Sequence, residues 1–560
     1  MSNQRHMDFF KAMLNLPGVL LGAFLMLWLP LVCAAEGVPS AAGTAVPTSS
    51  DTRPETPPAV DGASQEAHRF DVMEYRVAGN TTLPTARIEE AVYPFLGERR
   101  TIQDVEKARL ALEQAYHDGG YLTVFVNLPE QKVEGGVVRL EVMEGKVDRL
   151  KVTGSRYYSL DHIKALAASL NEGNVPNFHD VQQELTDLNR DPGRRVTPVL
   201  RAGRIPGTVE AELKVEDRLP LHASVELNDR YSKGTSKTRL SAAVRYDNLW
   251  QEGHSLNLNL QVAPENTDES KVLVATYVAP LSSGNTLAAY AVASDTDVTT
   301  VGGVNSLGKG TILGLRYVMP LRQRPGLFHS LSLGVDYKDY QDTQRFLGQD
   351  NNLPITYMPF SVGYDLTLAG EKSQTQIGLS SIFSLRGVVS DEAEFAAKRT
   401  GGQADFIYFK ADVKQNWQLP HGLGLQARLG GQFSGSPLIS NEQMAAGGAD
   451  TVRGYPESTA LGDRGFQAGM ELHGPSLAKS LSDALDELHV LGFVDGARLS
   501  YLDAGVGQQS SFSLASVGLG LRFRAKKAFS GSLDYAVALR DAGSVKSGDE
   551  RLHFRLGAEW

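Results

Sequence analysis

Cysteine is almost absent from the sequence. Cys33 is the only one among 560 residues, and it lies in an N-terminal stretch that we expect to be removed. Without thiols, the mature chain can form neither a disulfide framework nor a thiolate metal site. This composition also suits passage through an oxidising compartment, where free thiols would react.

The sequence also lacks an excess of positive charge. Its formal net charge is −10 and its isoelectric point is near 5.7, which argues against a nucleic-acid partner. Apolar runs long enough to cross a bilayer as a helix do not recur beyond the N-terminus, and the mean hydropathy is −0.22. A membrane protein of this composition would have to be a β-barrel, in which half of each strand faces water. A soluble periplasmic protein fits the composition equally well, so the residue pattern has to decide.

The N-terminus has the pattern of a secretory signal. A basic region precedes an apolar run over 13–32, and small residues suitable for cleavage follow it. We predict a signal peptide over residues 1–35. The run approaches membrane-spanning length, and Cys33 could carry a lipid, but Val32 stands where a lipidation site needs a small residue. Residues 36–69 then form a linker rich in Pro, Ala and Ser, with too few apolar side chains to fold.

Two segments, each of about 75 residues, repeat the same pattern of predicted elements. Residues 70–145 show a strand over Phe70–Tyr75, then two helices and two strands, and the second helix starts with Thr101-x-x-Asp104, which resembles a capping box. Residues 146–218 repeat that order. Tandem repetition at this spacing predicts two α/β domains of the same fold.

In residues 219–560 the pattern changes to strands in which apolar and polar residues alternate. Leu256, Leu258, Leu260 and Val262 alternate with asparagine and glutamine, and the same period of two recurs toward the C-terminus. Strands of about ten residues with this alternation predict a transmembrane antiparallel β-barrel, with lipid outside and water inside. At about twenty residues per strand and connection, the segment is long enough for about sixteen strands. A soluble sandwich also alternates, but the steady spacing favours the barrel.

The last predicted strand ends on an aromatic residue. Leu552, Phe554, Leu556, Ala558 and Trp560 occupy alternate positions, which would direct all of them toward lipid and place Trp560 in an interfacial girdle. We expect Phe554, Leu556 and Trp560 to form the C-terminal signal that barrel assembly machinery recognises during insertion. The alternative is the edge strand of a soluble sheet, which does not require an apolar face up to the final residue.

A glycine-rich segment, GGADTVRGYPESTALGD, interrupts the strand pattern. It contains the four residues that we predict to shape a loop tip: Val452, Arg453, Gly454 and Tyr455. An arginine on a loop is most often a solvated surface charge. Here Phe493-Val494-Asp495 lies one predicted strand further on, and an arginine fork suits a carboxylate. If Arg453 and Asp495 meet inside the barrel, they fix this loop in the pore.

Catalytic and cofactor motifs are not evident. The nearest is Gly303-x-x-x-x-Gly308-Lys309-Gly310, but a phosphate-binding loop needs Ser or Thr where Gly310 stands. The zinc-protease pattern HExxH and the hydrolase pattern GxSxG do not occur. We therefore expect no enzyme activity, no catalytic residues, no cofactor and no bound metal, and a barrel fused to a hydrolase has no support.

Fragments from every part of the chain occur in an order that one family shares. The first α/β segment has YRVAGNTTL, AYHDGGYLTVFVNLPEQ and GVVRLEVMEG, and the second has VTGSRYY and LNRDPGRRVTPVLRAGRIPGTVEAELKVEDRLP. The barrel segment has RYDNLWQEGHSLNL and YVAPL, then VRGYPESTALGDRG and FVD. Together they resemble the outer-membrane transporters of two-partner secretion, of the ShlB/FhaC/HecB type. The resemblance covers residues 70–560, and VRGYPESTALGDRG is similar to that family's sixth extracellular loop.

The resemblance implies two POTRA domains, over 70–145 and 146–218, followed by the barrel over 219–560. It places the barrel in the outer membrane of a Gram-negative bacterium and the POTRA domains in the periplasm. It also implies that Arg453 contacts Asp495 of the barrel wall. The implied partners are outer-membrane lipid and a secreted exoprotein with an N-terminal secretion domain, such as an adhesin or a haemolysin. We expect a monomer.

One feature departs from the family. Its members often begin with an amphipathic helix that plugs the pore, and residues 36–68 show only a Pro-rich stretch. Two other functions also stay open. An outer-membrane protein insertase of the same superfamily would share the barrel and the loop, although insertases usually carry more POTRA units. A passive porin would need no periplasmic repeats, so residues 70–218 argue against it.

Overall fold

The computed structural model describes residues 69–189, 193–232, 235–296, 298–301, 304–346, 349–505 and 507–560. The chain divides into two compact units, 1–67 and 68–560, and the described residues all belong to the second. The predicted signal peptide and almost all of the predicted linker therefore lie outside the described residues.

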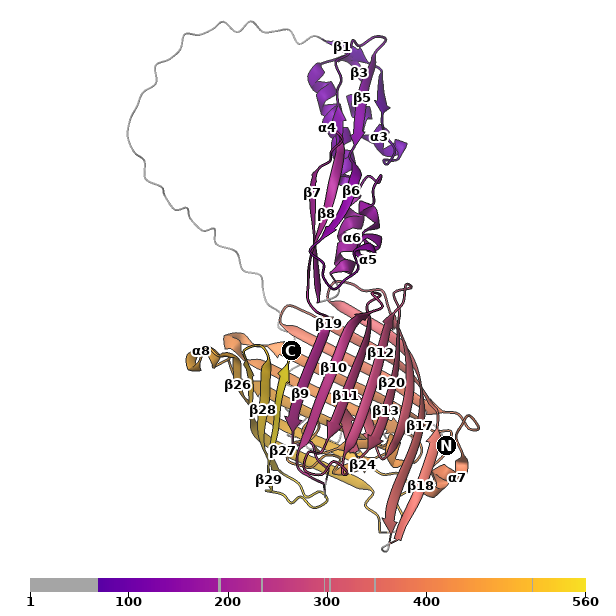
Figure 1. The fold of residues 1–560 in the computed structure, drawn as a ribbon, viewed down its shortest axis with the longest axis vertical. Helices are drawn as coiled ribbons and strands as arrows, with labels where there is room; N and C mark the ends of the chain where they lie inside the picture. Colours follow the sequence, from indigo (N-terminus) through magenta and orange to yellow (C-terminus); the bar gives the residue numbers. More distant parts are fainter. Residues whose placement is uncertain are drawn as a thin grey trace, which may run out of the picture. The chain divides into compact units, whose positions relative to one another are not determined.

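The first α/β domain packs a three-stranded sheet against helices (Figure 1, indigo). Its elements are β1 (Phe70–Val72), β2 (Glu74–Ala78), α3 (Thr85–Val92), η1 (Tyr93–Phe95), β3 (Gly97–Arg100), α4 (Ile102–Asp118), β4 (Val124–Asn127) and β5 (Val137–Glu144). The sheet order is β2-β5-β4, with β2 parallel and β4 antiparallel to β5. Ile88, Leu112, Tyr116 and Leu140 are buried in one cluster between the helices and the sheet.

The start of this domain differs from the sequence prediction. We expected one strand over Phe70–Tyr75, but it is broken at Met73, whose N–H donates to the Gly136 carbonyl at 2.7 Å. As a result β1 pairs with β3, a strand that the pattern did not predict. Helix α4 starts where the pattern predicts, because the Asp104 carboxylate accepts hydrogen bonds from the Thr101 N–H (3.0 Å) and hydroxyl (2.9 Å).

The second α/β domain repeats the topology of the first. Its elements are β6 (Lys146–Thr153), α5 (Leu160–Leu166), η2 (Ala168–Leu170), α6 (Phe178–Leu188), β7 (Arg194–Ala202) and β8 (Thr208–Asp217). The sheet order is β6-β8-β7, with β6 parallel and β7 antiparallel to β8. Its core contains Ile163, Leu170, Leu188 and Leu213. The shared order accounts for the repeat seen in the sequence.

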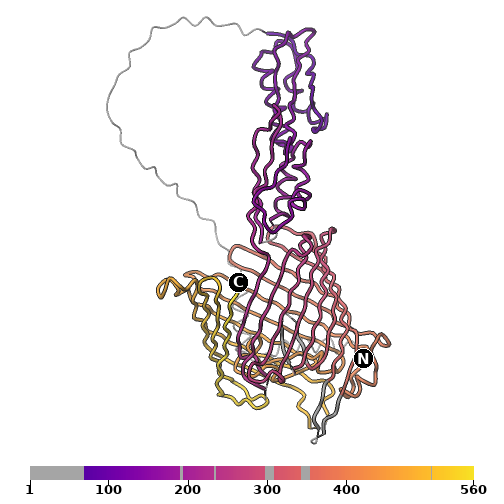
Figure 2. The backbone as a smooth tube through the Cα atoms, in the orientation of Figure 1, coloured from indigo at the N-terminus to yellow at the C-terminus, as the bar shows by residue number. Residues whose placement is uncertain are grey.

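The C-terminal part is a closed antiparallel barrel (Figures 1 and 2). Its strands are β9 (Leu221–Asn228), β10 (Arg239–Leu249), β11 (His254–Val262), β12 (Lys271–Pro280), β13 (Thr286–Asp295), β16 (Gly310–Pro320), β17 (Leu327–Phe346), β18 (Gln349–Tyr357), β19 (Pro359–Ala369), β20 (Ser373–Ser384), β21 (Ile407–Gln418), β22 (Gly424–Ser434), β25 (Arg464–His473), β26 (Leu485–Ser500), β27 (Ser511–Ala525), β28 (Phe529–Ala538) and β29 (Glu550–Glu559). The long strand β17 pairs with both β18 and β19, which together form one interrupted crossing. The described residues therefore make sixteen crossings, as the sequence predicts.

The two faces of the barrel differ as the alternation predicts. Leu258, Leu333, Leu519 and Leu552 are exposed on the outer face, where lipid would cover them. Charged side chains such as Asp336, Asp495 and Asp534 are buried on the inner face. No helix in the described part of the chain is long and apolar enough to cross a bilayer.

Three connections on the same side of the barrel contain structure of their own. The hairpin of β14 (Val298–Val301) and β15 (Val304–Leu307) precedes β16, and α7 (Glu392–Lys398) precedes β21. The third, residues 435–463, is called the lumen loop below. It contains η4 (Ser440–Glu442) and a hairpin of β23 (Met444–Ala446) and β24 (Ala460–Gly462). On the opposite side, α8 (Ala478–Leu481) precedes β26.

Candidate functional site

The tip of the lumen loop is held by an ion pair inside the barrel. Arg453 donates from Nε to Asp495 Oδ2 at 2.7 Å and from Nη2 to Asp495 Oδ1 at 3.0 Å. The Arg453 backbone N–H also donates to Oδ2 at 3.3 Å. Arg453 is 1% exposed and Asp495 is 2% exposed. The structure thus brings together the two residues whose pairing the sequence predicted.

Further groups around Arg453 were not predicted from the sequence. Its Nη1 lies 2.6 Å from Glu471 Oε1 on β25 and 3.8 Å from Asp534 Oδ1 on β28. Its guanidinium carbon lies 3.5 Å from the centre of the Phe493 ring, close enough for a cation–π contact. Phe493 belongs to the predicted wall motif, whereas Glu471 and Asp534 become neighbours of Arg453 only through strand register.

The charges of this cluster balance. Three guanidinium groups, those of Arg453, Arg428 and Arg522, face three carboxylates, those of Asp495, Glu471 and Asp534. Arg428 bonds Asp495 at 2.7 Å and Arg522 bonds Asp534 at 2.7 Å. Burial alone would lower the pKa of Arg453, but hydrogen bonds and charge from Asp495 raise it overall. The loop arginine therefore stays charged at any physiological pH.

The neighbours of Arg453 in the motif fit the tip to the wall. Gly454 has a φ of +92°, a conformation that glycine adopts at no steric cost. Its N–H donates to His553 Nε2 on β29 at 3.1 Å. The Tyr455 hydroxyl lies 2.8 Å from the Arg540 carbonyl and 3.0 Å from the Ala515 carbonyl. Val452 is buried in a cluster with Leu499 and Leu514.

The base of the lumen loop depends on a second buried ion pair. Asp463 is fully buried; its Oδ2 accepts from Arg399 Nη2 at 2.8 Å and from the Leu502 N–H at 2.6 Å. Its Oδ1 accepts from the Leu438 N–H and from Gln443 Nε2, both at 2.9 Å. No local pattern predicts a role for Asp463, although it ends the glycine-rich segment that carries the motif.

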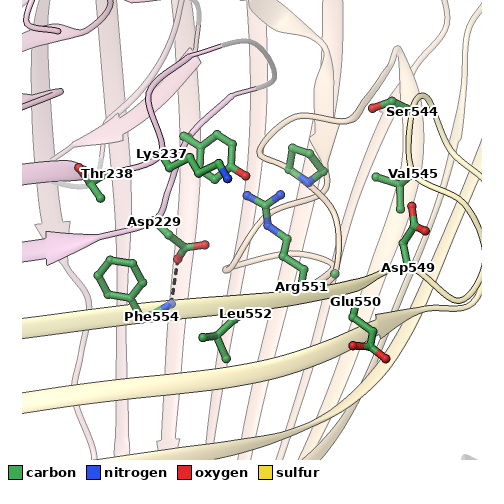
Figure 3. Close-up of a pocket in the computed structure, with 13 residues that line it drawn as sticks. Asp229, Lys237, Thr238, Ser544, Val545, Asp549, Glu550, Arg551, Leu552 and Phe554 are labelled. Carbon is green, nitrogen blue, oxygen red and sulfur yellow. Dashed lines mark hydrogen bonds between the residues drawn. The ribbon is translucent and has the colours of Figure 1, made fainter. Parts of the chain in front are cut away.

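The tip also reaches the seam where the first and last strands of the barrel meet. The β9–β29 ladder runs from Asn228–Arg555 to Ser224–Glu559, and backbone hydrogen bonds continue it to Ala223 and Trp560. Beyond this pairing, Asp229 Oδ1 accepts from the Phe554 N–H at 2.9 Å (Figure 3, dashed line). Its Oδ2 lies 3.0 Å from His553 Nδ1. The other ring nitrogen of His553, Nε2, accepts from the Gly454 N–H of the loop.

A cavity of about 630 Å³ opens next to this seam, lined from β29, the lumen loop and the chain after β9 (Figure 3). Phe554 contributes to it, whereas Leu556 and Trp560 are exposed on the outer face. The three residues of the predicted C-terminal signal therefore do not form one site with Arg453. No group of His, Cys, Asp and Glu side chains in the described ranges is arranged to hold a metal ion.

Comparison with known families agrees with this geometry. Residues 207–523 match the haemolysin secretion/activation protein family ShlB/FhaC/HecB, and residues 70–145 match the ShlB-type POTRA domain. The chain belongs to this family. Like other ShlB/FhaC/HecB proteins, it is an outer-membrane transporter of two-partner secretion, with its POTRA region in the periplasm. The second α/β domain lies outside the POTRA match, and we propose it as a second POTRA domain from its repeated topology.

Curated relatives are similar over most of their length. The heme/hemopexin transporter protein HuxB of Haemophilus influenzae is 22% identical over 79% of this chain and 78% of its own. The outer membrane transporter CdiB of Dickeya dadantii is 23% identical over 72% of each chain. Among solved structures, CdiB from Escherichia coli has a TM-score of 0.57 at 19% identity, covering 91% of this chain and 93% of its own.

A similar fold occurs in BamA. BamA from Haemophilus ducreyi lacking POTRA domains 1–3 has a TM-score of 0.53 at 15% identity, covering 88% of this chain and 100% of its own. This similarity concerns the fold alone. The family match therefore favours the secretion transporter over the insertase.

Proposed function

We propose that this ShlB/FhaC/HecB transporter binds one large exoprotein in the periplasm and passes it, unfolded, through the barrel lumen to the cell surface. The observation that carries the proposal is the lumen loop, whose tip is anchored in the pore by Arg453 and Asp495. A passive porin carries no polypeptide through its lumen and would not need a loop anchored there. The partner would carry an N-terminal secretion domain, as adhesins and haemolysins do.

Recognition would use strand addition to a POTRA sheet, in which backbone hydrogen bonds supply affinity and side chains supply choice. The edge of β4 is already occupied by α4. Arg109 Nη1 donates to the Val126 carbonyl at 2.9 Å, and the Val126 N–H donates to Glu113 Oε2 at 3.0 Å. His117 Nε2 lies 3.2 Å from the Val124 carbonyl. Adding a strand there would first require removing these side chains.

The opposite edge of the first domain is available. In the described part of the chain, the backbone of β2 (Glu74–Ala78) forms hydrogen bonds only with β5 and Gly136. In the second domain, the edge strand β7 carries Pro198, which has no N–H to offer. We infer that the exoprotein adds to β2 as an extended strand.

No nucleotide site is needed for this mechanism. Folding of the exoprotein outside the cell would make its passage irreversible, because the folded product cannot return through the lumen. The C-terminal residues Phe554, Leu556 and Trp560 would act earlier, when assembly machinery inserts the barrel as a monomer. The alternative function is insertion of other outer-membrane proteins, and the fold shared with BamA is compatible with both functions.

A secretion assay separates the two functions. The protein is produced together with a candidate exoprotein that carries an N-terminal secretion domain, and the culture medium is assayed for that exoprotein. Deletion of residues 70–217 should abolish its release while the barrel still forms conducting pores in planar bilayers. If the deletion also lowers the levels of unrelated outer-membrane proteins and leaves release unchanged, the insertase function is correct and the secretion proposal is wrong.

A further inference from the structure

A second carboxylate of the lumen loop is buried against a different part of the wall. Glu442 in η4 is 3% exposed. Its Oε1 lies 2.5 Å from Lys338 Nζ on β17 and 2.6 Å from the Tyr357 hydroxyl on β18. Its Oε2 accepts from the Tyr408 hydroxyl on β21 at 2.6 Å. Three strands thus supply one donor each to a single loop side chain.

The surroundings of Glu442 are apolar, although the lumen of such a barrel is expected to be polar. The wall residues Tyr340, Ile355, Tyr357 and Tyr408 form one buried cluster with Phe395 of α7 and with Leu438 and Ile439 of the lumen loop. Lys398 of α7 also donates to Asn441 Oδ1 at 3.2 Å. Through this apolar cluster, α7 and the first part of the lumen loop pack against the barrel wall.

The Glu442 anchor is separate from the Arg453 anchor. Glu442 bonds side chains of β17, β18 and β21, whereas Arg453 lies against β25, β26 and β28. These sets share no strand and are separated by β22 in the barrel order. The lumen loop is therefore fixed on two separate arcs of the wall.

Charge and hydrogen bonding explain why the Glu442 side chain stays bound to the wall. A buried carboxylate with a cation and two hydroxyl donors is satisfied, and removal of one partner leaves the other charge uncompensated. Burial alone would raise the pKa of Glu442, but Lys338 and the two tyrosine hydroxyls lower it overall. The contact is therefore ionic at neutral pH.

We propose that Glu442 is a second anchor of the lumen loop, a positioning residue that holds α7 and residues 435–442 against β17, β18 and β21 as the resting plug on that side of the pore. The plug belongs to the extracellular connections of the barrel and needs no N-terminal helix. Its significance rests on the proposed passage through the lumen, but its test requires no exoprotein, so the two can fail independently.

The test uses the mature protein, which has no cysteine once the predicted signal peptide is removed, in planar bilayers and in detergent. Glu442→Gln removes the charge at constant size, and Glu442→Asp keeps the charge as a conservative rescue. Lys338→Met combined with Glu442→Gln removes both charges of the ion pair and is the milder change for folding. Glu371→Gln, at an exposed carboxylate in the turn between β19 and β20, is the matched control.

Two cysteine probes report the position of the loop. Leu438→Cys lies in the proposed plug, and Ala460→Cys lies near the tip; both native residues are at most 2% exposed. Compared with the parent, the single variant Glu442→Gln and the double variant with Lys338→Met should show about twofold higher conductance. Both should also show about tenfold faster labelling of the cysteine at position 438. Labelling at position 460 should not change, and Glu442→Asp and Glu371→Gln should resemble the parent.

Two results would overturn the proposal. One is that the double variant has the same conductance and the same labelling rates as the parent, since Glu442 would then not hold the loop in place. The other is equal acceleration at positions 438 and 460, because the loop would then move as one body and Glu442 would not be a separate anchor. If Glu442→Gln alone fails to assemble, the double variant decides between the outcomes.

Discussion

Asp495 receives Arg453 with both carboxylate oxygens, although the two residues lie 42 positions apart in the sequence, one on a loop and one on a strand. The pair is almost completely buried and shares its surroundings with Glu471. An ion pair in this setting fixes the loop tip at one place on the wall, because the two side-chain hydrogen bonds hold the guanidinium and the carboxylate in one geometry.

Arg453→Ala should reduce secretion of the exoprotein strongly while the barrel still inserts. Loss of one partner from a buried pair costs about 3–5 kcal/mol, and less where water enters the lumen. The barrel strands keep their own hydrogen bonds, so resistance to unfolding in detergent should persist. Release of the exoprotein is measured alongside the gel mobility of the unheated protein. Arg322→Ala, at an exposed arginine outside the barrel strands, is the control. Full secretion by Arg453→Ala would remove the loop from the mechanism.

Gly454→Ala should weaken the tip through backbone conformation rather than through crowding. At a φ of +92°, a side chain costs about 1–2 kcal/mol, whereas the added carbon would meet neighbours only at ordinary contact distances of 3.4–3.5 Å. Gly507→Ala provides the comparison, since Gly507 has a φ of +81° and open space around it. Both changes should carry a similar conformational cost, and only Gly454→Ala should lower secretion. Equal secretion by the two variants would contradict a role for the tip conformation.

The second α/β domain should lose stability in acid through Asp217. Burial alone would raise the pKa of Asp217, but hydrogen bonds from the Tyr157 and Arg156 N–H groups and the Ser155 hydroxyl lower it overall. A carboxyl with a lower pKa in the folded state stabilises fully above its unfolded pKa of about 4. That stabilisation is lost as the pH falls through the folded value.

Hydrogen exchange of peptides from 146–217 measures this effect in the full chain. Protection should fall between neutral pH and pH values below about 4 more steeply in the parent than in Asp217→Asn. The variant should already be less protected at neutral pH. If the two proteins differ by the same amount at every pH, Asp217 is not the group that titrates.

The edge of β2 should become protected when the exoprotein binds. With the purified secretion domain of the candidate exoprotein, backbone amides of Glu74–Ala78 should exchange more slowly, because strand addition engages main-chain groups. Amides of Val124–Asn127 should not change, since side chains of α4 already cover that edge. Protection confined to Val124–Asn127 would place the binding edge on the other side of the sheet.

Much of the architecture follows from local pattern. The alternation in segments such as 256–262 depends only on the strand period of two, and the structure exposes Leu258 and Leu260 as that period requires. The pairing of Arg453 with Asp495 was suggested by the family resemblance rather than by the residues alone. Without it, Asp495 is one of many acidic residues in the lumen.

The partners that the sequence did not identify depend on register and on loop packing. Glu471 stands opposite Phe493 in the β25–β26 ladder, next to the Gly469–Asp495 pair, and no local pattern encodes that alignment. Glu442 and Asp463 lie in a loop whose course is set by distant strands. The break at Met73 escaped prediction for a similar reason, because its cause is a hydrogen bond to Gly136.

Closure of the barrel joins residues that are far apart in the sequence: Arg555 on β29 bonds Glu226 on β9 across 329 positions. Contacts of such long range form late and slowly. Until the final ten-residue strand is in place, both β9 and β28 present unsatisfied backbone edges that invite aggregation. The newly exported polypeptide therefore needs an escort across the periplasm, and loss of even a short C-terminal segment would leave a sheet that cannot be sealed.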